Sequence, residues 1–251
     1  MKKLLLKNLW QTVAAILFLI AVWIVAHKIV GNELLIPNFF DSFSSVGELL
    51  VKGVFWQGLG MSLLRALYAF IISFIFGGVL AVIAYLYPTF GGFLAPIVSA
   101  LRSLPILAVL LILLSFLGAG KAPVAVAFLA LFPMLYTGIL AALSGIDKHL
   151  IEIGRVCGAS KPKRVFAIYL PLSSPYVLRE AGGALAFSLK LVVSAEVLAN
   201  TAKSIGGMMQ EAKLYAEIPQ LFALVGVAFI VGLLLELSVN LLAEWVEKEV
   251  K

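Results

Sequence analysis

The chain has 251 residues, of which 63% are hydrophobic and 13% charged, and its mean hydropathy is +1.10. Soluble domains contain roughly 45–50% apolar and about 25% charged residues, so lipid must cover part of this surface and an ordinary soluble domain is excluded. The net charge of +6 does not predict nucleic-acid binding. Most basic residues flank apolar segments, where they would meet lipid headgroups or a partner protein.

The first apolar segment, 9–30, predicts a membrane-spanning helix, since about 20 mostly apolar residues cross a bilayer. Lys2 and Lys3 ahead of it imitate the start of a signal peptide. The apolar run, however, continues to Val30 without a small-residue cleavage site. We therefore expect a retained first helix.

A long uncharged stretch, 66–101, exceeds the length of one span. Proline and glycine interrupt helices, and segment 87–92 contains both, so it is predicted to break the stretch. Segment 118–123 is predicted to be the next turn, and 206–209 a hinge or external turn. The spans expected after the first are 61–86, 93–117, 124–143, 176–199 and 220–243. Together they give an all-α membrane protein with about six transmembrane helices.

The basic residues are unequally divided between the two sides of the membrane. With the amino terminus inside, the cytoplasmic segments hold eleven Lys and Arg residues and the external segments hold six. The positive-inside bias therefore favours an N-in, C-in topology, and the inverted topology would place the basic loop 144–172 outside. The cytoplasmic residues are Lys2, Lys3, Lys7, Lys148, Arg155, Lys161, Lys163, Arg164, Arg179, Lys248 and Lys251, and the external ones are Lys28, Lys52, Arg65, Lys121, Lys203 and Lys213.

Loop 144–172 is too long and too regularly patterned for a plain connector. Asp147 can cap a short helix whose apolar residues gather on one side. Gly158 permits a sharp turn, and Pro162 can open a second short helix. We expect a helix–turn–helix lying across the inner membrane face, with an apolar surface that suits a groove on a partner. The apolar residues are Leu150, Ile151, Ile153 and Val156.

Within this loop the chain resembles the permeases of bacterial ABC importers. Their cytoplasmic signature is E-A-A, three residues, G, nine residues and I-x-L-P. This chain has Glu152-Ile153-Gly154, Gly158 and Ile168-Tyr169-Leu170-Pro171 at those spacings, with both alanines replaced. The resemblance implies a type I ABC importer permease-like bundle in which this loop is the coupling helix that sits in a cleft of the ATPase subunit. The ATPase-docking residues that it implies are Glu152, Gly154, Arg155, Gly158, Ala159, Ser160, Ile168, Leu170 and Pro171.

Shorter pieces elsewhere are similar to the nitrate, sulfonate and taurine branch of that family. The resemblance implies a division into 1–58, a peripheral transmembrane helix with an external segment, and 59–251, the permease core. Lys190 departs from the branch, in which an aromatic or neutral residue is expected there. The matching pieces are Ile36-Pro37, Ser62-Leu63-Leu64-Arg65, Gly77-Gly78, Arg102-Ser103-Leu104-Pro105, Phe132-Pro133, Gly158-Ala159-Ser160 and Ala195-Glu196.

The family resemblance also implies the protein's location and partners. A multi-pass permease of this kind lies in the cytoplasmic (inner) membrane, pairs with a second permease copy as a homodimer, and receives solute from an extracytoplasmic solute-binding protein. An ABC ATPase subunit binds and hydrolyses ATP, so no cofactor is expected in this chain. The expected cargo is a small anionic or zwitterionic solute.

The charged residues Arg102, Lys190, Glu196 and Glu236 are among those that fall within the expected spans. Such a residue costs roughly 2.5–3.5 kcal/mol on insertion scales, so a functional role is the default interpretation. In one hypothesis Lys190 lines the translocation pathway and attracts the solute, together with Arg102 and Glu196. In the other, Lys190 pairs with Glu196 or Glu236 on a neighbouring helix or on the second subunit.

Other functional classes have less support from the sequence. The chain contains no G-x-x-x-x-G-K-[ST] phosphate loop, so it is not predicted to be an enzyme that hydrolyses ATP. A channel or secondary transporter without an ATPase partner is the alternative, although no inverted repeat is evident. A membrane-embedded enzyme has only the intramembrane charges in its favour. His27 and His149 are isolated and Cys157 is the single cysteine, so neither a metal site nor an internal disulfide is predicted.

Overall fold

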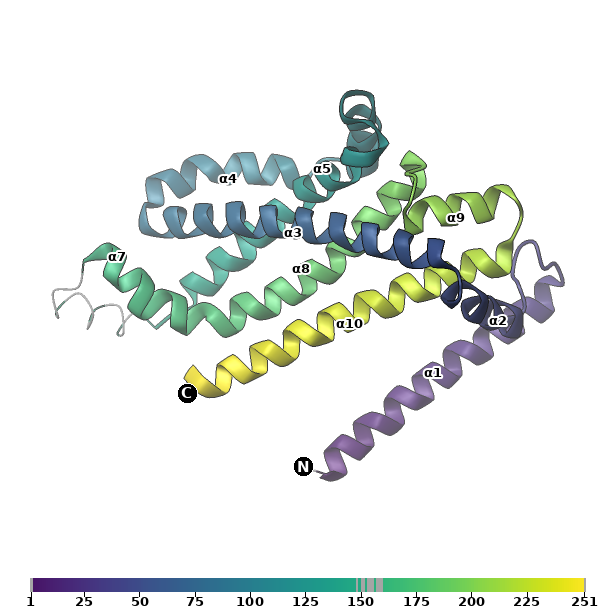
Figure 1. Ribbon diagram of the computed structural model, residues 1–251. Helices are drawn as coiled ribbons and strands as arrows, with labels where there is room; N and C mark the ends of the chain where they lie inside the picture. The colour runs from purple at the N-terminus through teal and green to yellow at the C-terminus, as the bar shows by residue number, and fades with distance from the viewer. Residues whose placement is uncertain (1, 148, 150–151, 153–155, 157–159, 251) are drawn as a thin grey trace.

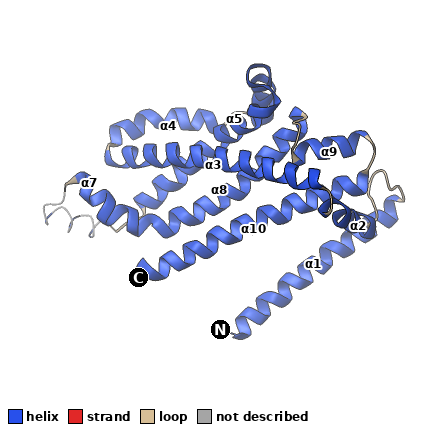
Figure 2. Cartoon of the chain, in the orientation of Figure 1, coloured by secondary structure: helices blue, strands red, loops and turns tan. Residues whose placement is uncertain are grey.

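The computed structural model describes the chain except for residues 1, 148, 150–151, 153–155, 157–159 and 251. The residues it describes form helices joined by short loops, with no strand among them, which confirms the all-α prediction (Figures 1 and 2). The elements are α1 (Lys2–Val30), α2 (Phe39–Leu50), α3 (Gly53–Leu86), α4 (Pro88–Arg102), α5 (Ile106–Ser144), α7 (Lys161–Arg164), a π-helical turn (Val165–Tyr169), α8 (Leu170–Ala199), α9 (Ile205–Leu214) and α10 (Ile218–Val250).

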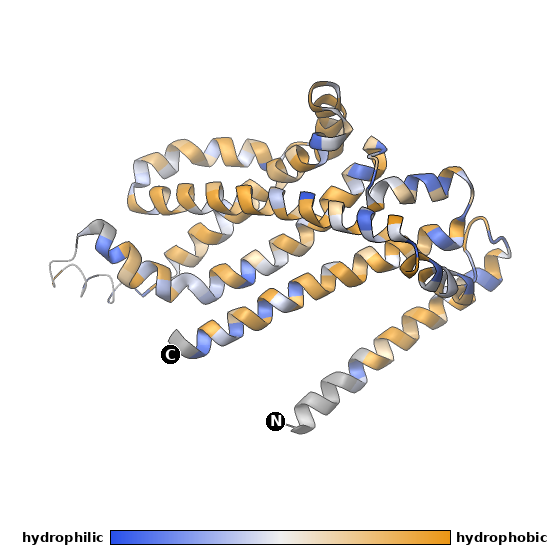
Figure 3. Cartoon of the chain, in the orientation of Figure 1, coloured by the Kyte–Doolittle hydropathy of each residue, from blue (hydrophilic) through white to orange (hydrophobic). Residues whose placement is uncertain are grey.

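Five of these helices, α1, α3, α5, α8 and α10, are long and apolar enough to cross a membrane. Their exposed surfaces are largely apolar, as lipid contact requires (Figure 3). α4 has 15 residues, which at 1.5 Å per residue reach about 22 Å and fall short of the roughly 30 Å hydrocarbon core. α3 begins at Gly53, so the division expected between 1–58 and 59–251 falls inside a helix.

The third expected span, 93–117, is not a single helix. α4 ends at Arg102 and α5 begins at Ile106, because Pro105 has no amide hydrogen to donate and disfavours helical geometry at the residue before it. The expected turn at 118–123 is a kink within α5. Gly118 adopts φ 70° and ψ 170°, which a residue without a Cβ atom tolerates, and the helix then resumes.

Two helices, α2 and α9, lie where the sequence predicted none. The prediction of a hinge or turn at 206–209 is wrong, because Ser204 caps α9 and its Oγ accepts a hydrogen bond from the Gly207 amide at 2.8 Å. α8 also begins at Leu170, earlier than the expected residue 176. The backbone is helical from Lys161 through the π-helical turn and on into α8.

The centre of the bundle is formed by α3, α5 and α8, and α10 packs along α8 (Figure 1). α7, the start of α1 and the end of α10 lie toward one end of the bundle, called the loop end here, as an N-in, C-in topology requires. α2 and α9 lie toward the other end, called the α9 end. Fully buried residues of the core include Ala69, Leu131, Leu135, Leu189 and Leu224.

α1 lies at the edge of the bundle, where the resemblance placed it. Its principal anchor is Trp23, whose ring lies 5.5 Å from that of Phe39 and 5.2 Å from that of Phe222, between ring centroids. The Trp23 indole also donates a hydrogen bond to the Pro37 carbonyl oxygen at 3.0 Å. The anchor lies near the α9 end of α1, and the exposed apolar side chains nearer its start are left for lipid to cover.

α3 and α5 approach each other closely at Gly77. A Cβ atom built there would lie 3.1 Å from the backbone nitrogen of Tyr136 and 3.3 Å from the Leu135 Cβ atom. The neighbouring Gly78 would place its Cβ atom 3.6 Å from a methyl group of Ile139, which is an ordinary contact. Only the first glycine is therefore required by the close approach of the two backbones.

This difference predicts opposite effects for two adjacent substitutions. Gly77→Ala should lower the thermal unfolding midpoint in mild detergent, because overpacking costs about 1–3 kcal/mol and the opposing atom is backbone. Gly78→Ala should leave the midpoint unchanged or raise it, since alanine favours a helix over glycine by about 0.5–1 kcal/mol. Equal midpoints for the two variants would contradict the packing at Gly77.

Candidate functional site

At the loop end, the structure describes helical residues in both parts of the chain where a short helix was expected, and the second part continues into α8. The Asp147 Oδ1 atom accepts a hydrogen bond from the His149 amide at 2.9 Å, as at the start of a helix. Of the residues described beyond it, His149, Glu152 and Val156 are helical. α7 begins at Lys161, so Pro162 lies in its first turn as expected.

The nine expected docking residues divide into those that the structure describes and those that it does not. Glu152 and Ser160 are exposed. At the end of the signature, Ile168 packs against the core, whereas Leu170 and Pro171 are exposed. The expected docking residues Gly154, Arg155, Gly158 and Ala159 lie outside the described residues.

Large apolar side chains are exposed along this part of the chain. The exposed fraction is 87% for Val156, 72% for Phe166 and 42% for Leu170. Between the last two, Tyr169 is buried, and its ring lies 5.3 Å from that of Tyr85 on α3, between centroids. The π-helical turn therefore fixes one face of the segment to the bundle and presents Phe166 and Leu170 on the other.

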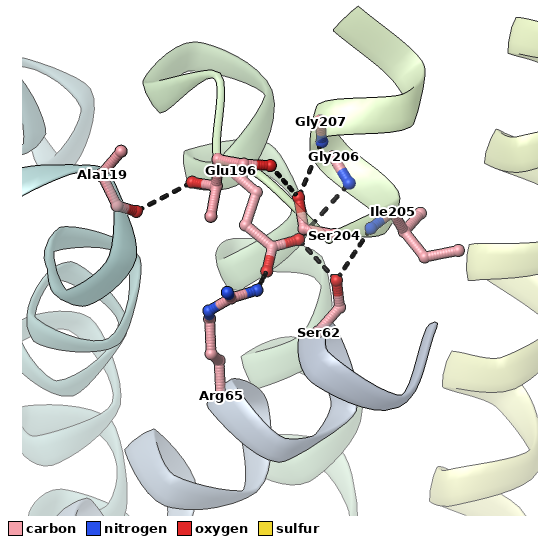
Figure 4. Close-up of polar contacts among 9 residues, drawn as sticks. Ser62, Arg65, Ala119, Glu196, Ser204, Ile205, Gly206 and Gly207 are labelled. Carbon is pink, nitrogen blue, oxygen red and sulfur yellow. Dashed lines mark hydrogen bonds and ion pairs between the residues drawn. The ribbon is translucent and has the colours of Figure 1, made fainter. Parts of the chain in front are cut away.

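At the α9 end, Glu196 lies at the centre of a cluster of polar groups (Figure 4). Its side chain is completely buried, and its Oε1 atom lies 2.7 Å from a guanidinium nitrogen of Arg65, whose side chain is 12% exposed. The Ser62 hydroxyl donates to the Oε2 atom at 2.6 Å, and the Gly206 amide donates to the same atom at 3.4 Å. The carboxylate thus accepts hydrogen bonds from the hydroxyl of Ser62 and the guanidinium of Arg65, both on α3, and from an amide of α9.

A second set of hydrogen bonds joins this cluster to the surrounding helices. The Ser62 hydroxyl oxygen accepts a hydrogen bond from the Ile205 amide at 3.0 Å, which satisfies the first amide of α9. The Thr201 hydroxyl donates to the carbonyl oxygen of Ala119 at 2.9 Å, directly after the kink in α5. Figure 4 shows α3, α5, α8 and α9 meeting at these residues.

These contacts assign Glu196 a partner that sequence reasoning missed. Arg65 was counted among the external charges, but it lies within α3 and neutralises Glu196, so the hypothesis that Glu196 pairs with Lys190 is wrong within this chain. One signal was available in the sequence. Ser62 and Arg65 are three residues apart and so share a face of an otherwise apolar helix, and a buried carboxylate requires such partners.

Lys190 lies apart from this cluster, at a cavity of about 290 Å³ between α8 and α10. Val193, Val225 and Phe229 are among the mainly apolar residues that line the cavity. In the described part of the chain no ion pair joins Lys190 to Glu236. Its assignment to the translocation pathway remains a prediction.

Arg102 lines a different cavity, of about 420 Å³, that lies between the α4–α5 junction and α8. The side chains of Thr137 and Glu180 line the same cavity. Glu180 is an intramembrane acid that sequence reasoning did not single out. The structure thus brings Arg102 together with Glu180, and with neither Lys190 nor Glu196. Among the described residues, no group of three or more His, Cys, Asp or Glu side chains is placed to hold a metal ion.

A family model described as the binding-protein-dependent transport system inner membrane component matches residues 73–251. The chain is 26% identical to the taurine transport system permease protein TauC of Escherichia coli (strain K12), and the match covers 92% of this chain and 86% of that protein. It is 27% identical to the bicarbonate transport system permease protein CmpB of Synechococcus elongatus, over 86% of this chain and 76% of that protein.

Two solved structures share the fold. A chain of the methionine ABC transporter MetNI, in an inward-facing conformation, aligns with a TM-score of 0.62 at 22% identity, covering 79% of this chain and 96% of that chain. A chain of a bacterial alginate ABC transporter, in complex with an alginate-bound periplasmic protein, aligns with a TM-score of 0.66 at 17% identity, covering 93% of this chain and 94% of that chain.

The buried cluster predicts a large and non-additive loss of stability when it is broken. Arg65→Ala and Glu196→Ala should each destabilise the protein by about 3–5 kcal/mol, because each leaves an uncompensated buried charge. The double variant should lose less than the sum, with a coupling energy on the order of 1–3 kcal/mol. Thermal unfolding in mild detergent measures all three, with Glu211→Ala on the exposed face of α9 as the matched control. Additive losses would contradict the direct pairing.

Proposed function

This chain belongs to the family of binding-protein-dependent transport system inner membrane components, and we propose that it passes a small anionic or zwitterionic solute into the cytoplasm. It is the permease subunit of an ABC importer and a multi-pass protein of the inner membrane. In our proposal a separate ABC ATPase docks at the loop end and supplies the free energy by hydrolysing ATP. An extracytoplasmic solute-binding protein delivers the solute at the α9 end.

The docking proposal is carried by the exposed apolar side chains at the loop end. Val156, Phe166 and Leu170 are exposed, and they belong to the segment before and at the start of α8, at the end of the bundle that the positive-inside bias assigns to the cytoplasm. Such a patch suits a groove on a partner, with Glu152 and Lys163 exposed nearby for polar contacts. The signature residues that the structure does not describe belong to the same proposed surface.

The continuous helical backbone from Lys161 into α8 gives this surface a means of acting on the membrane. A displacement of the docked segment would be transmitted along α8, because a helix without an intervening loop moves with little internal deformation. α8 contacts α3, α5, α9 and α10, so its movement would shift the packing of the central helices. Closing and opening of the ATPase subunits would thereby alternate the access of the pathway between the two sides.

The solute class is proposed from the relatives and from the charges in the spans. The relatives matched over most of the chain include permeases named for taurine, aliphatic sulfonates and bicarbonate, which are small and carry a negative group, whereas a relative matched over 53% of the chain is named for choline, a cation. Arg102 and Lys190 are exposed in the isolated chain, and both would attract such a group. We propose a second copy of this chain as the other half of the pathway, following the homodimer that the resemblance implies.

The docking proposal predicts loss of the ATPase partner on a single substitution. Val156→Asp should reduce the ATPase that co-purifies with the tagged chain from native membranes on the order of tenfold or more, because a charge placed in an apolar groove costs several kcal/mol. Val54→Asp is the matched control, since Val54 is also an exposed valine but lies at the start of α3, toward the α9 end. Mass spectrometry of the purified complexes quantifies the partner.

Two outcomes of this experiment would count against docking at the loop end. If both valine variants retain the ATPase, the exposed patch is not the docking surface. If both lose it equally, the loss reflects general damage to the protein. Loss from the Val156 variant alone supports the proposal.

A further inference from the structure

Two cavities lie in sequence along the groove between α5 and α8. The first, of about 420 Å³, contains Arg102 and Thr137, and the second, of about 630 Å³, extends to Asp147 at the loop end. Both are lined by Gly138 and Glu180, so these two residues mark the point at which the cavities meet. The groove therefore connects the break between α4 and α5 with the loop end.

The position of Glu180 depends on the glycine that faces it. A Cβ atom built on Gly138 would lie 2.6 Å from both the Cγ and the Cδ atoms of Glu180. Real side chains do not approach so closely, so any residue other than glycine would push the carboxylate away from α5. Gly138 thus allows Glu180 to lie across the groove where the two cavities meet.

No ion pair or hydrogen bond joins Arg102 or Glu180 to another side chain in the part of the chain that the structure describes, which sets them apart from the paired charges Arg65, Glu196 and Arg179. Arg65 and Glu196 neutralise each other at 2.7 Å. Arg179, the residue next to Glu180, lies 2.6 Å from Glu247 on α10. A charge inside a span faces water or a charged ligand unless it is paired, so these two remain directed to the contents of the groove.

We propose that the groove between α5 and α8 is the inner half of the translocation pathway, and that it is adapted to a solute carrying both a negative and a positive group. Arg102 faces the negative group, and Glu180 accepts hydrogen bonds from the positive group. This inference rests on the proposed function and narrows its solute class from anionic or zwitterionic to zwitterionic.

The order of charges along the groove disfavours a solute that carries only a negative charge and one that carries only a positive charge. A solute with only a negative charge is attracted by Arg102 but meets Glu180 and then Asp147 before it leaves, and each of these repels it. A solute with only a positive charge meets Arg102 first. A zwitterion offers a partner to each charge in turn, and guanidinium–carboxylate and carboxylate–ammonium contacts are both charge-assisted.

A thiol-protection experiment on the complex with its ATPase tests the proposal. Cys157→Ser removes the one native thiol, and Thr137→Cys then places a thiol in the first cavity. Its alkylation by neutral N-ethylmaleimide is measured in the presence of equal concentrations of β-alanine, propionate or propylammonium, which have similar sizes and different charges. Ser44→Cys, on the exposed face of α2 and outside both cavities, is the matched control.

The expected result is that β-alanine slows alkylation of the Thr137 variant about 2–5-fold more than either simple ion, as one further solvent-exposed ion contact provides. In the Glu180→Gln variant, β-alanine should slow alkylation no more than propionate does. In the Arg102→Gln variant, β-alanine should slow alkylation no more than propylammonium does. Gly138→Ala should act like Glu180→Gln, because it displaces the carboxylate without removing it. The control thiol should not be protected by any of the three.

Three results would overturn the inference: propionate protecting as well as β-alanine, no protection by any probe, or an advantage of β-alanine that survives Glu180→Gln. Equal protection of the Ser44 control would do the same, because the effect would not come from the groove. The proposed function is judged separately by the ATPase that co-purifies with the same variants. A retained ATPase with absent protection removes only this inference, whereas absence of the ATPase removes the docking proposal.

Discussion

The ion pair between Arg65 and Glu196 is the contact on which the arrangement at the α9 end depends. A carboxylate with no exposed surface is tolerable in an apolar bundle only when a cation and further donors reach it. Those donors come from α3 and from the Gly206 amide of α9, while the Ile205 amide donates to Ser62, so the pair fixes the register of α3 against α8 and also holds the start of α9. The hydrogen bond between Thr201 and Ala119 adds the kink of α5 to the same unit.

The two ends of the bundle consequently differ in how firmly α8 is held. At the α9 end α8 is tied by buried charge-assisted hydrogen bonds, which are costly to break. At the loop end its beginning is held by the contact of Tyr169 with Tyr85 and by the partly exposed ion pair of Arg179 with Glu247, while Phe166 and Leu170 remain exposed. A force applied to the loop end by a docked ATPase would therefore pivot α8 about the Glu196 cluster rather than slide it. The groove between α5 and α8 lies on the loop-end side of that pivot.

Much of the fold could be predicted from the sequence, because lipid imposes a simple rule on length and polarity. The positions of most of the long helices follow from uncharged stretches, whereas the docking role expected of the signature residues stays a prediction. What escaped prediction depends on contacts between distant segments. Pro105 and Gly118 were visible, but whether each ends a helix, bends it or is tolerated is decided by packing. α9 was missed because its cap, Ser204, precedes two glycines that normally interrupt a helix.

The same distinction applies to the charges within the spans. The sequence identifies Arg102, Lys190 and Glu196 as expensive, but it does not show which of them are neutralised by other parts of the protein. Pairing separates them: Glu196 is enclosed with Arg65, whereas Arg102 shares a cavity with Glu180. Lys190 lies at a separate, mostly apolar cavity beside α10, and no residue lines both its cavity and that of Arg102. A charge that the fold has already neutralised serves the architecture, and one left facing a cavity remains available to a solute.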